Sequence, residues 1–68
     1  MTRREKVAAF LRGRGQEGAT NGEIARATGI EPLQLVFNIT NRMLARGDVR
    51  ARRLRDTGRW HFTWRRGA

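Results

Sequence analysis

The amino-acid sequence predicts a single α+β domain, residues 1–68, that is mainly helical and ends in a small β-hairpin. Two pairs of residues, each a Thr followed three positions later by a Glu, have the spacing of helix-capping boxes. A D-T-G turn signal at residues 56–58 lies between two segments with the pattern of strands. With no cysteine, this short chain depends on a modest packed core, without disulfide bonds or thiolate metal sites.

The first helix is expected over residues 2–12. Thr2 and Glu5 can form a capping box, in which each side chain binds the backbone N–H of the other residue. The buried face of this helix is expected to consist of Val7, Phe10 and Leu11. We expect the helix to end at Gly13 and the glycine-rich segment 13–18 to form a flexible turn.

The second helix is expected over residues 20–28, directly after a very short strand at residues 19–20. Thr20 and Glu23 repeat the capping-box spacing. Gly29 can adopt the left-handed conformation that ends many helices, so it marks the C-terminal end of this one.

The third helix is expected over residues 31–46, after a turn in which Ile30 is buried. Pro32 suits the first position of a helix, where its missing N–H loses no hydrogen bond, and Gly47 marks the end. One buried stripe is expected to contain Val36, Ile39 and Met43. A short helix, a tight turn and a longer helix with polar residues on its outer face together form a helix-turn-helix.

Residues 48–65 should form the hairpin. Three aromatic residues alternate along its second strand and therefore share one face: Trp60, Phe62 and Trp64. Leu54 breaks the alternation of the first strand, so either it follows a bulge or it belongs to the turn. A four-residue loop, residues 56–59, would pair Ala51 with Trp64, whereas a second register would pair Leu54 with Trp60, and both registers remain open.

The aromatic residues of the hairpin are expected to have two different roles. Phe62 and Trp64 should close the core over the first and third helices. Trp60 is nearest the tip of the hairpin, so it can either join that core or stack on a base, a sugar or an arginine.

Two sequence stretches followed by a basic hairpin resemble the winged-helix family of nucleic-acid-binding domains. They are E-I-A-x-x-T-G-I at residues 23–30 and V-x-x-I-x-x-x-M-L-A-R-G-D-V-R at residues 36–50, and the resemblance extends over about residues 7–64. It implies a winged helix-turn-helix whose third helix enters the major groove of DNA and whose hairpin contacts the backbone or the minor groove. The third helix departs from the family pattern, because it carries Leu33 and Phe37 where Ser, Thr or Arg is usual.

The charge of the chain favours an anionic partner. Lys and Arg number 15 against 6 Asp and Glu, which gives a formal net charge of +9. Nearly all of the cations are arginine, which suits bidentate contact with phosphate, although a GC-rich genome also enriches arginine. Five arginines gather on the hairpin and are candidate phosphate contacts: Arg50, Arg52, Arg53, Arg55 and Arg59. The alternative is an edge strand protected from aggregation by its charge.

The outer face of the third helix carries the candidate base contacts. They are Gln34, Asn38, Asn41 and Arg42. Asn and Gln can bind adenine bidentately and Arg can bind guanine, although the same residues also suit a plain solvent-exposed face. Thr20 and Asn21, at the start of the second helix, could hold a phosphate. Leu33 and Phe37 form a second apolar line, which could widen the core, contact thymine methyl groups or bury against a second chain.

The preferred interpretation is sequence-specific binding of duplex DNA by a small transcriptional regulator or a phage- or plasmid-type protein. A protein-interaction module and a binder of structured RNA are the alternatives, and a homodimer or larger complex could form through Leu33 and Phe37. His61 is the single histidine and Ser is absent, so we expect no enzyme, cofactor, metal or small-molecule ligand. Without a membrane-spanning or signal segment, we expect a soluble protein of the cytoplasm or nucleoid.

Overall fold

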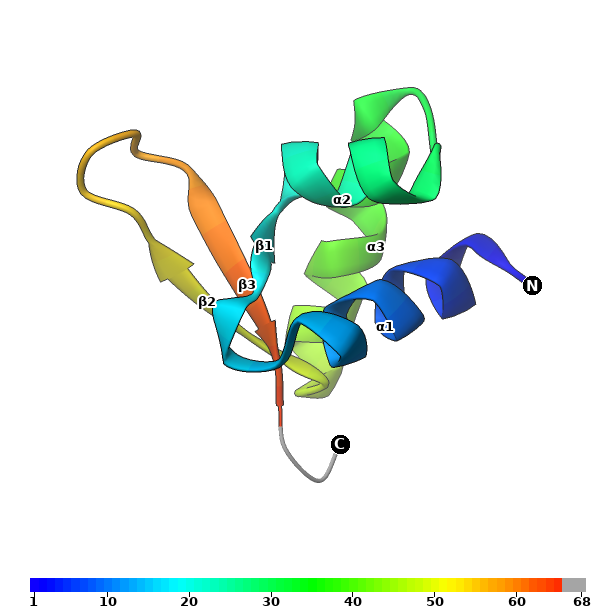
Figure 1. The fold of residues 1–68 in the computed structure, drawn as a ribbon, viewed down its shortest axis with the longest axis horizontal. Coiled ribbons are helices and arrows are strands. Elements are labelled where there is room, and N and C mark those ends of the chain that lie inside the picture. Colours follow the sequence, from blue (N-terminus) through cyan, green and yellow to red (C-terminus); the bar gives the residue numbers. More distant parts are fainter. Residues whose placement is uncertain (66–68) are drawn as a thin grey trace.

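A computed structural model describes residues 1–65 of the chain; residues 66–68, expected to belong to the same domain, lie outside the described part. It has three α-helices and a three-stranded antiparallel sheet. The helices lie on one side of the sheet, and the loop of the hairpin extends away from them (Figure 1). The elements in chain order are α1 (Arg3–Arg14), the 3-10 turn η1 (Gly15–Glu17), β1 (Ala19–Thr20), α2 (Asn21–Thr28), α3 (Leu33–Arg46), β2 (Val49–Arg53) and β3 (Trp60–Trp64).

Both predicted capping boxes are confirmed. The Thr2 hydroxyl accepts the Glu5 N–H at 3.1 Å, while the Glu5 carboxylate accepts the Thr2 N–H at 2.9 Å. Thr20 and Glu23 make the same reciprocal pair at 3.2 and 2.9 Å. These local contacts explain why α1 and α2 begin directly after Thr2 and Thr20, one residue later than the expected ranges.

The predicted end of α1 was wrong, since the helix continues through Gly13 to Arg14. A glycine inside a helix costs only about 1 kcal/mol, so packing of the helix can outweigh it. Gly15 ends α1 instead, with a φ of +58° that other residues rarely adopt.

The predicted start of α3 was also wrong, because Pro32 lies just outside the helix. Its backbone is extended (ψ 167°), and its carbonyl accepts the Leu35 N–H at 2.9 Å, so Leu33 is the first helical residue. The predicted ends of α2 and α3 are confirmed: Gly29 and Gly47 are left-handed, with φ of +73° and +82°.

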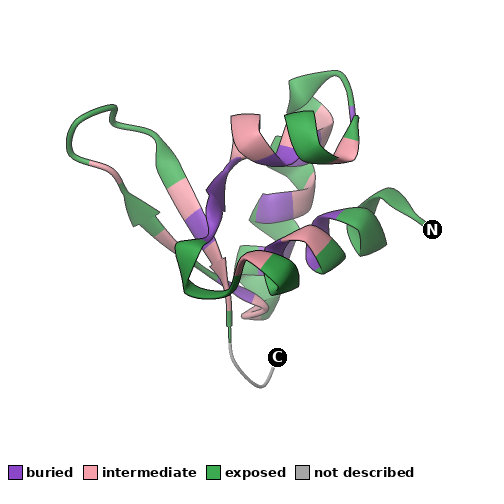
Figure 2. Ribbon diagram, viewed as in Figure 1, coloured by how far each residue is buried: buried purple, intermediate pink, exposed green. Residues whose placement is uncertain are grey.

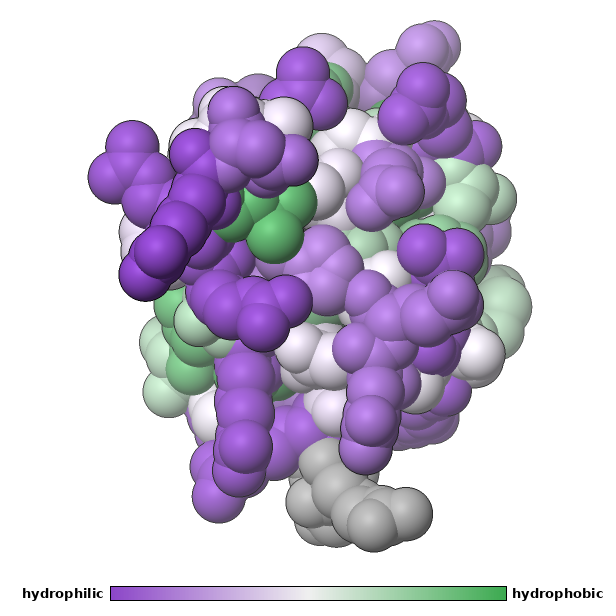
Figure 3. Space-filling view, turned by 60° about the vertical axis from the view of Figure 1, so that its left-hand side comes forward, coloured by the Kyte–Doolittle hydropathy of each residue, from purple (hydrophilic) through white to green (hydrophobic). Residues whose placement is uncertain are grey.

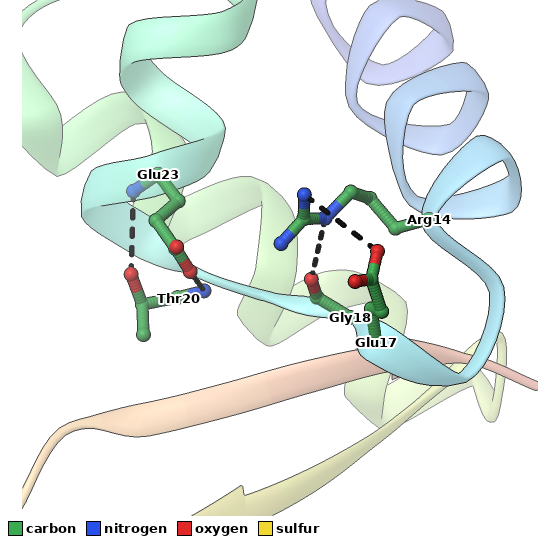
Figure 4. Close-up of polar contacts among 5 residues, drawn as sticks. All are labelled: Arg14, Glu17, Gly18, Thr20 and Glu23. Carbon is green, nitrogen blue, oxygen red and sulfur yellow. Dashed lines mark hydrogen bonds and ion pairs between the residues drawn. The ribbon is translucent and has the colours of Figure 1, made fainter.

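The segment between α1 and β1 is structured, in contrast to the flexible turn predicted for it. Arg14 Nε donates to the Gly18 carbonyl at 2.8 Å, and its guanidinium lies 3.9 Å from the Glu17 carboxylate (Figure 4). Gly18 is buried, and a Cβ there would collide with the Phe62 carbonyl oxygen and lie 2.7 Å from His61 Cε1. Only glycine therefore fits at this position without a rearrangement.

The core lies between the three helices and the inner face of the sheet, where the buried segments gather (Figure 2). On α3 the fully buried residues are Val36, Thr40 and Met43, so the predicted stripe was wrong at Ile39, which is half-buried. The Thr40 hydroxyl is satisfied by a 2.8 Å hydrogen bond to Asn21, which is why a polar residue can occupy this position. The buried apolar residues are Val7, Ala8, Leu11, Ala19, Ile24, Ile30, Val36, Met43, Val49 and Phe62.

The sheet has the order β1-β3-β2, so β3 is its central strand. Ala51 pairs with Phe62 and Arg53 with Trp60, and neither of the two predicted registers is right. Leu54 belongs to the turn, because its N–H donates to the Arg59 carbonyl at 2.8 Å. This pairing leaves residues 54–59 as the connection between the two strands, which is longer than the four-residue loop expected. The D-T-G turn signal does not by itself specify the length of this connection.

The alternating aromatic residues share one face of β3, as predicted, but they differ in exposure. Phe62 is buried beside Ala51 and Ala19, which confirms its core role. Trp64 is half-buried, with the Arg12 guanidinium 4.7 Å from its ring centroid. Trp60 is 51% exposed near the end of the hairpin, so it does not close the core.

Candidate functional site

The outer face of α3 presents the four polar residues singled out in the sequence. Gln34, Asn38, Asn41 and Arg42 are all exposed. Their position follows from helical geometry, because the buried residues of α3 occupy the opposite side. Gln34 Nε2 donates to Asn38 Oδ1 at 3.2 Å, which aligns these two amides across one turn.

The flank of α3 that faces α1 is basic. Asn38 and Arg42 line a shallow depression together with Thr2, Arg3 and Arg4 from the start of α1. Sequence reasoning missed Arg3 and Arg4, because nothing in the local pattern indicates that the first turn of α1 lies beside α3.

The flank that faces the hairpin is apolar and hollowed. A groove runs along it between α3 and the hairpin, and we call it the α3–hairpin groove. One stretch, also bordered by the end of β1 and by α2, has a volume of about 480 Å³. Four of the exposed large hydrophobic residues line it: Leu33 (43% exposed), Phe37 (37%), Leu44 (43%) and Trp60 (51%). The other lining residues are Thr20, Asn21, Gly22, Arg26, Asn41, Ala51, Arg59 and Phe62. Arg26 and Leu44 were not singled out in the sequence.

The hairpin arginines do not form one cluster. Arg50 and Arg52 pair with Thr63 and His61, which directs them to the sheet face opposite the core. Arg53 shares the inner face with Trp60, and its Nε donates to the Gly58 carbonyl at 3.3 Å.

The other two predicted phosphate contacts of the hairpin, Arg55 and Arg59, are exposed and lie in the connection between the strands. Hydrophilic side chains cover much of the surface on the hairpin side, with smaller hydrophobic areas between them (Figure 3). Within residues 1–65, the one ion pair joins Arg14 and Glu17, so none of the hairpin arginines is neutralised by a carboxylate there. An anion would find arginines on both flanks of α3: Arg3 and Arg4 beside one flank, and Arg26 and Arg59 beside the other.

The side chains of Thr20 and Asn21, predicted to hold a phosphate, are engaged within the fold. Thr20 accepts the Glu23 N–H, and the Asn21 side-chain oxygen accepts the Thr40 hydroxyl proton. The Glu23 carboxylate accepts the Thr20 N–H, and this hydrogen bond, with nearby Arg14, lowers its pKa. Hydrogen bonds from Thr2 lower the pKa of Glu5 in the same way.

The described part of the chain contains no group of three or more His, Cys, Asp or Glu residues arranged to hold a metal ion. None of the helices within residues 1–65 is both long enough and apolar enough to span a membrane. Comparisons with protein-family models, curated proteins and solved structures found no match to this chain.

Proposed function

We propose that this chain is a winged helix-turn-helix that binds duplex DNA in a sequence-specific manner. In this proposal α3 enters the major groove, and the hairpin contacts the neighbouring backbone or minor groove. The order of the elements supports the winged-helix assignment, because a β1 segment precedes α2 and a two-stranded hairpin follows α3.

The observation that carries the proposal is an exposed row of amides with arginines on both flanks. Gln34, Asn38 and Asn41 lie on the outer face of α3, where each amide could bind an adenine edge bidentately. Arg42 lies beside them and could bind guanine, or a phosphate if its side chain turns outward. Base-reading groups and phosphate-binding groups therefore occur on the same helix.

Arg3 and Arg4 strengthen the electrostatic argument. Both occupy the first turn of α1, where the helix dipole disfavours cations by about 0.3–1 kcal/mol each. They also share a depression with Arg42, so like charges lie near one another. A DNA phosphate at this position would interact favourably with the arginines and with the positive end of the helix dipole. It would thereby offset the repulsion that these groups exert on one another.

The cellular role proposed from this activity is that of a small transcriptional regulator or a phage- or plasmid-type DNA-binding protein. Such a protein would act inside the cell, in the cytoplasm or nucleoid, and by binding rather than catalysis. One recognition helix contacts only a few base pairs, so a homodimer or a larger complex through Leu33 and Phe37 is part of the proposal.

Selection of bound sequences from a random duplex pool is the direct test. The expected result is an enriched motif that contains adenine, since three of the four candidate base contacts are amides. Binding that enriches no motif would contradict sequence-specific readout. Absence of any binding at low salt would contradict DNA binding altogether.

A protein-interaction module is a second candidate function, favoured by the exposed apolar residues of the α3–hairpin groove. Salt dependence separates the two, because contacts with phosphate weaken steeply as salt is added while apolar contacts do not. Structured RNA is the third candidate, and competition between duplex DNA and duplex RNA for the protein tests it.

A further inference from the structure

The α3–hairpin groove combines exposed aromatic rings with arginines. Phe37 and Trp60 line both of its stretches, and Arg26 and Arg59 line the stretch of about 480 Å³. None of the described residues lining the groove is a carboxylate. Its size lies in the range of sites that hold a small organic ligand.

This combination of groups matches a nucleotide that is not base-paired. Aromatic side chains stack on the face of a base, and bases within a duplex have both faces covered by their neighbours. Trp60, which is 51% exposed, can therefore stack on a base that has left the duplex stack but not on a base inside it. Arginine guanidinium groups bind phosphate through paired N–H donors, which suits Arg26 and Arg59 to the backbone of the same nucleotide.

We propose that the α3–hairpin groove binds an unpaired nucleotide adjoining the duplex, with its base against Trp60 and Phe37 and its phosphates against Arg26 and Arg59. This inference rests on the proposed binding of duplex DNA and specifies its substrate further. It replaces the protein contact proposed for Leu33 and Phe37, because both residues line this groove. The domain would bind a duplex with an unpaired flank, such as a strand end or a junction, more tightly than an uninterrupted duplex.

The lining of the groove favours a nucleotide over a helix of a partner protein. Helix-in-groove recognition uses a continuous apolar surface that receives anchors at successive turns. Here the apolar surface is interrupted by Asn21 and Asn41, and both arginines lie in the same stretch as Leu33 and the two aromatic rings.

The test compares a blunt duplex with the same duplex carrying a short thymine overhang on either strand. Fluorescence anisotropy would give the ratio of the two affinities for the full chain. We expect the overhang probe to bind about ten-fold tighter, the factor that one stacked base supplies. Trp60→Leu should bring this ratio close to one, whereas Trp60→Phe, which keeps an aromatic ring, should retain most of it.

The arginines allow a matched comparison. Arg26→Ala should lower the ratio, because Arg26 lines the groove. Arg46→Ala should leave the ratio unchanged, because Arg46 is equally an exposed helical arginine but lies in the last turn of α3, outside the groove. Thermal melting of each variant would verify that the fold is retained.

Each outcome is decisive. Equal binding of blunt and overhang probes by the wild-type chain would overturn the inference while leaving duplex binding intact. A ratio that survives Trp60→Leu in a folded variant would also overturn it. No binding of the blunt duplex, with retained binding of the overhang probe, would instead contradict the proposed duplex-binding function. A ratio of one, together with Trp60-dependent binding of an acidic amphipathic helical peptide, would assign the groove to a protein partner.

Discussion

The Thr40 hydroxyl on α3 donates a 2.8 Å hydrogen bond to the Asn21 side-chain oxygen on α2. Thr40 is fully buried, and its oxygen also lies 3.1 Å from the Val36 carbonyl within its own helix. This contact joins α2 and α3 through polar side-chain groups. It sets the first turn of α2 against the middle of α3, from which the candidate base contacts project.

Replacing Thr40 should therefore destabilise the fold. Thr40→Val keeps the shape of the side chain but leaves the half-buried Asn21 oxygen without its donor, at a cost of about 1–2 kcal/mol. Denaturant unfolding would measure the change, and an Asn21→Ala variant with the double mutant would isolate the coupling between the two residues. A Thr40→Val protein more stable than wild type would contradict this account.

Gly18 and Gly13 should respond in opposite directions to the same substitution. Gly18→Ala should destabilise the protein by at least about 2 kcal/mol, because a Cβ collides with the Phe62 carbonyl and the φ of +61° is unfavourable for alanine. Gly13→Ala is the matched control: it lies within α1 with open space around it, so it should stabilise by up to about 1 kcal/mol. Thermal melting of both variants shows whether the segment between α1 and β1 is packed or flexible. A flexible segment would tolerate alanine at Gly18 as well as at Gly13.

Acid should weaken both capping boxes. Backbone hydrogen bonds from Thr20 and Thr2 hold the pKa values of Glu23 and Glu5 below their ordinary value of 4.5. A carboxyl group with a lowered pKa in the folded state stabilises the fold fully above its unfolded pKa, and this contribution is lost as the pH falls through the folded value. The free energy of unfolding should thus decrease as the pH falls below 4.5.

Glu23→Gln provides the control for this pH dependence. Its amide oxygen can still accept the Thr20 N–H, but the group no longer titrates. Denaturant unfolding across the acidic range should show a shallower loss of stability than in wild type. An unchanged slope would indicate that Glu23 does not couple protonation to folding.

Duplex binding should depend steeply on salt. Contact of about four to six arginines with phosphate predicts a slope of log K against log salt of about −4 to −5. Arg59→Ala should make the slope less negative by about one, because one phosphate contact is lost, while the sequence preference stays unchanged. Titrations of random duplex at several salt concentrations would measure this slope. An affinity that does not change with salt would contradict phosphate contact.

Asn41 distinguishes a base-reading helix from a solvent-exposed one. If Asn41 only faces water, Asn41→Ala should stabilise α3 by about 0.5 kcal/mol and leave DNA binding unaltered. If it binds adenine, the same change should weaken binding to the selected site by about 1–3 kcal/mol with little effect on random duplex. We expect the second result, from melting and binding measured on one preparation. A more stable variant with the same preference for the selected site would exclude Asn41 as a base contact.

The features predicted correctly from sequence are those governed by neighbouring residues. The capping boxes at Thr2 and Thr20 and the left-handed ends at Gly29 and Gly47 each depend on a few consecutive positions. The register of the hairpin depends on the length of its loop and on packing of Phe62 against β1 and the helices, and both predicted registers failed. Neither the loop length nor the packing of Phe62 corresponds to a fixed spacing of residues in the sequence, so neither could be predicted from it.

In the candidate site too, features set by neighbouring residues were predicted and those set by distant residues were not. Helical periodicity alone was sufficient to predict that Gln34, Asn38 and Asn41 are exposed. It could not indicate that the first turn of α1 brings Arg3 beside one flank, or that the hairpin forms a groove with the other. Thr40 was missed for a related reason, because its burial depends on a partner in α2 that is distant in the sequence.

The central position of β3 has a consequence for synthesis of the protein on the ribosome. β3 pairs with β1 on one side and β2 on the other, and it supplies Phe62 to the core, yet it is the last of the described elements to be made. A nascent chain that stops before Trp60 contains the residues of all three helices but lacks the strand that pairs with both β1 and β2. Because contacts between distant segments must wait for both segments, the helices should remain loosely associated until β3 emerges from the ribosome, and the domain should then fold in one cooperative step.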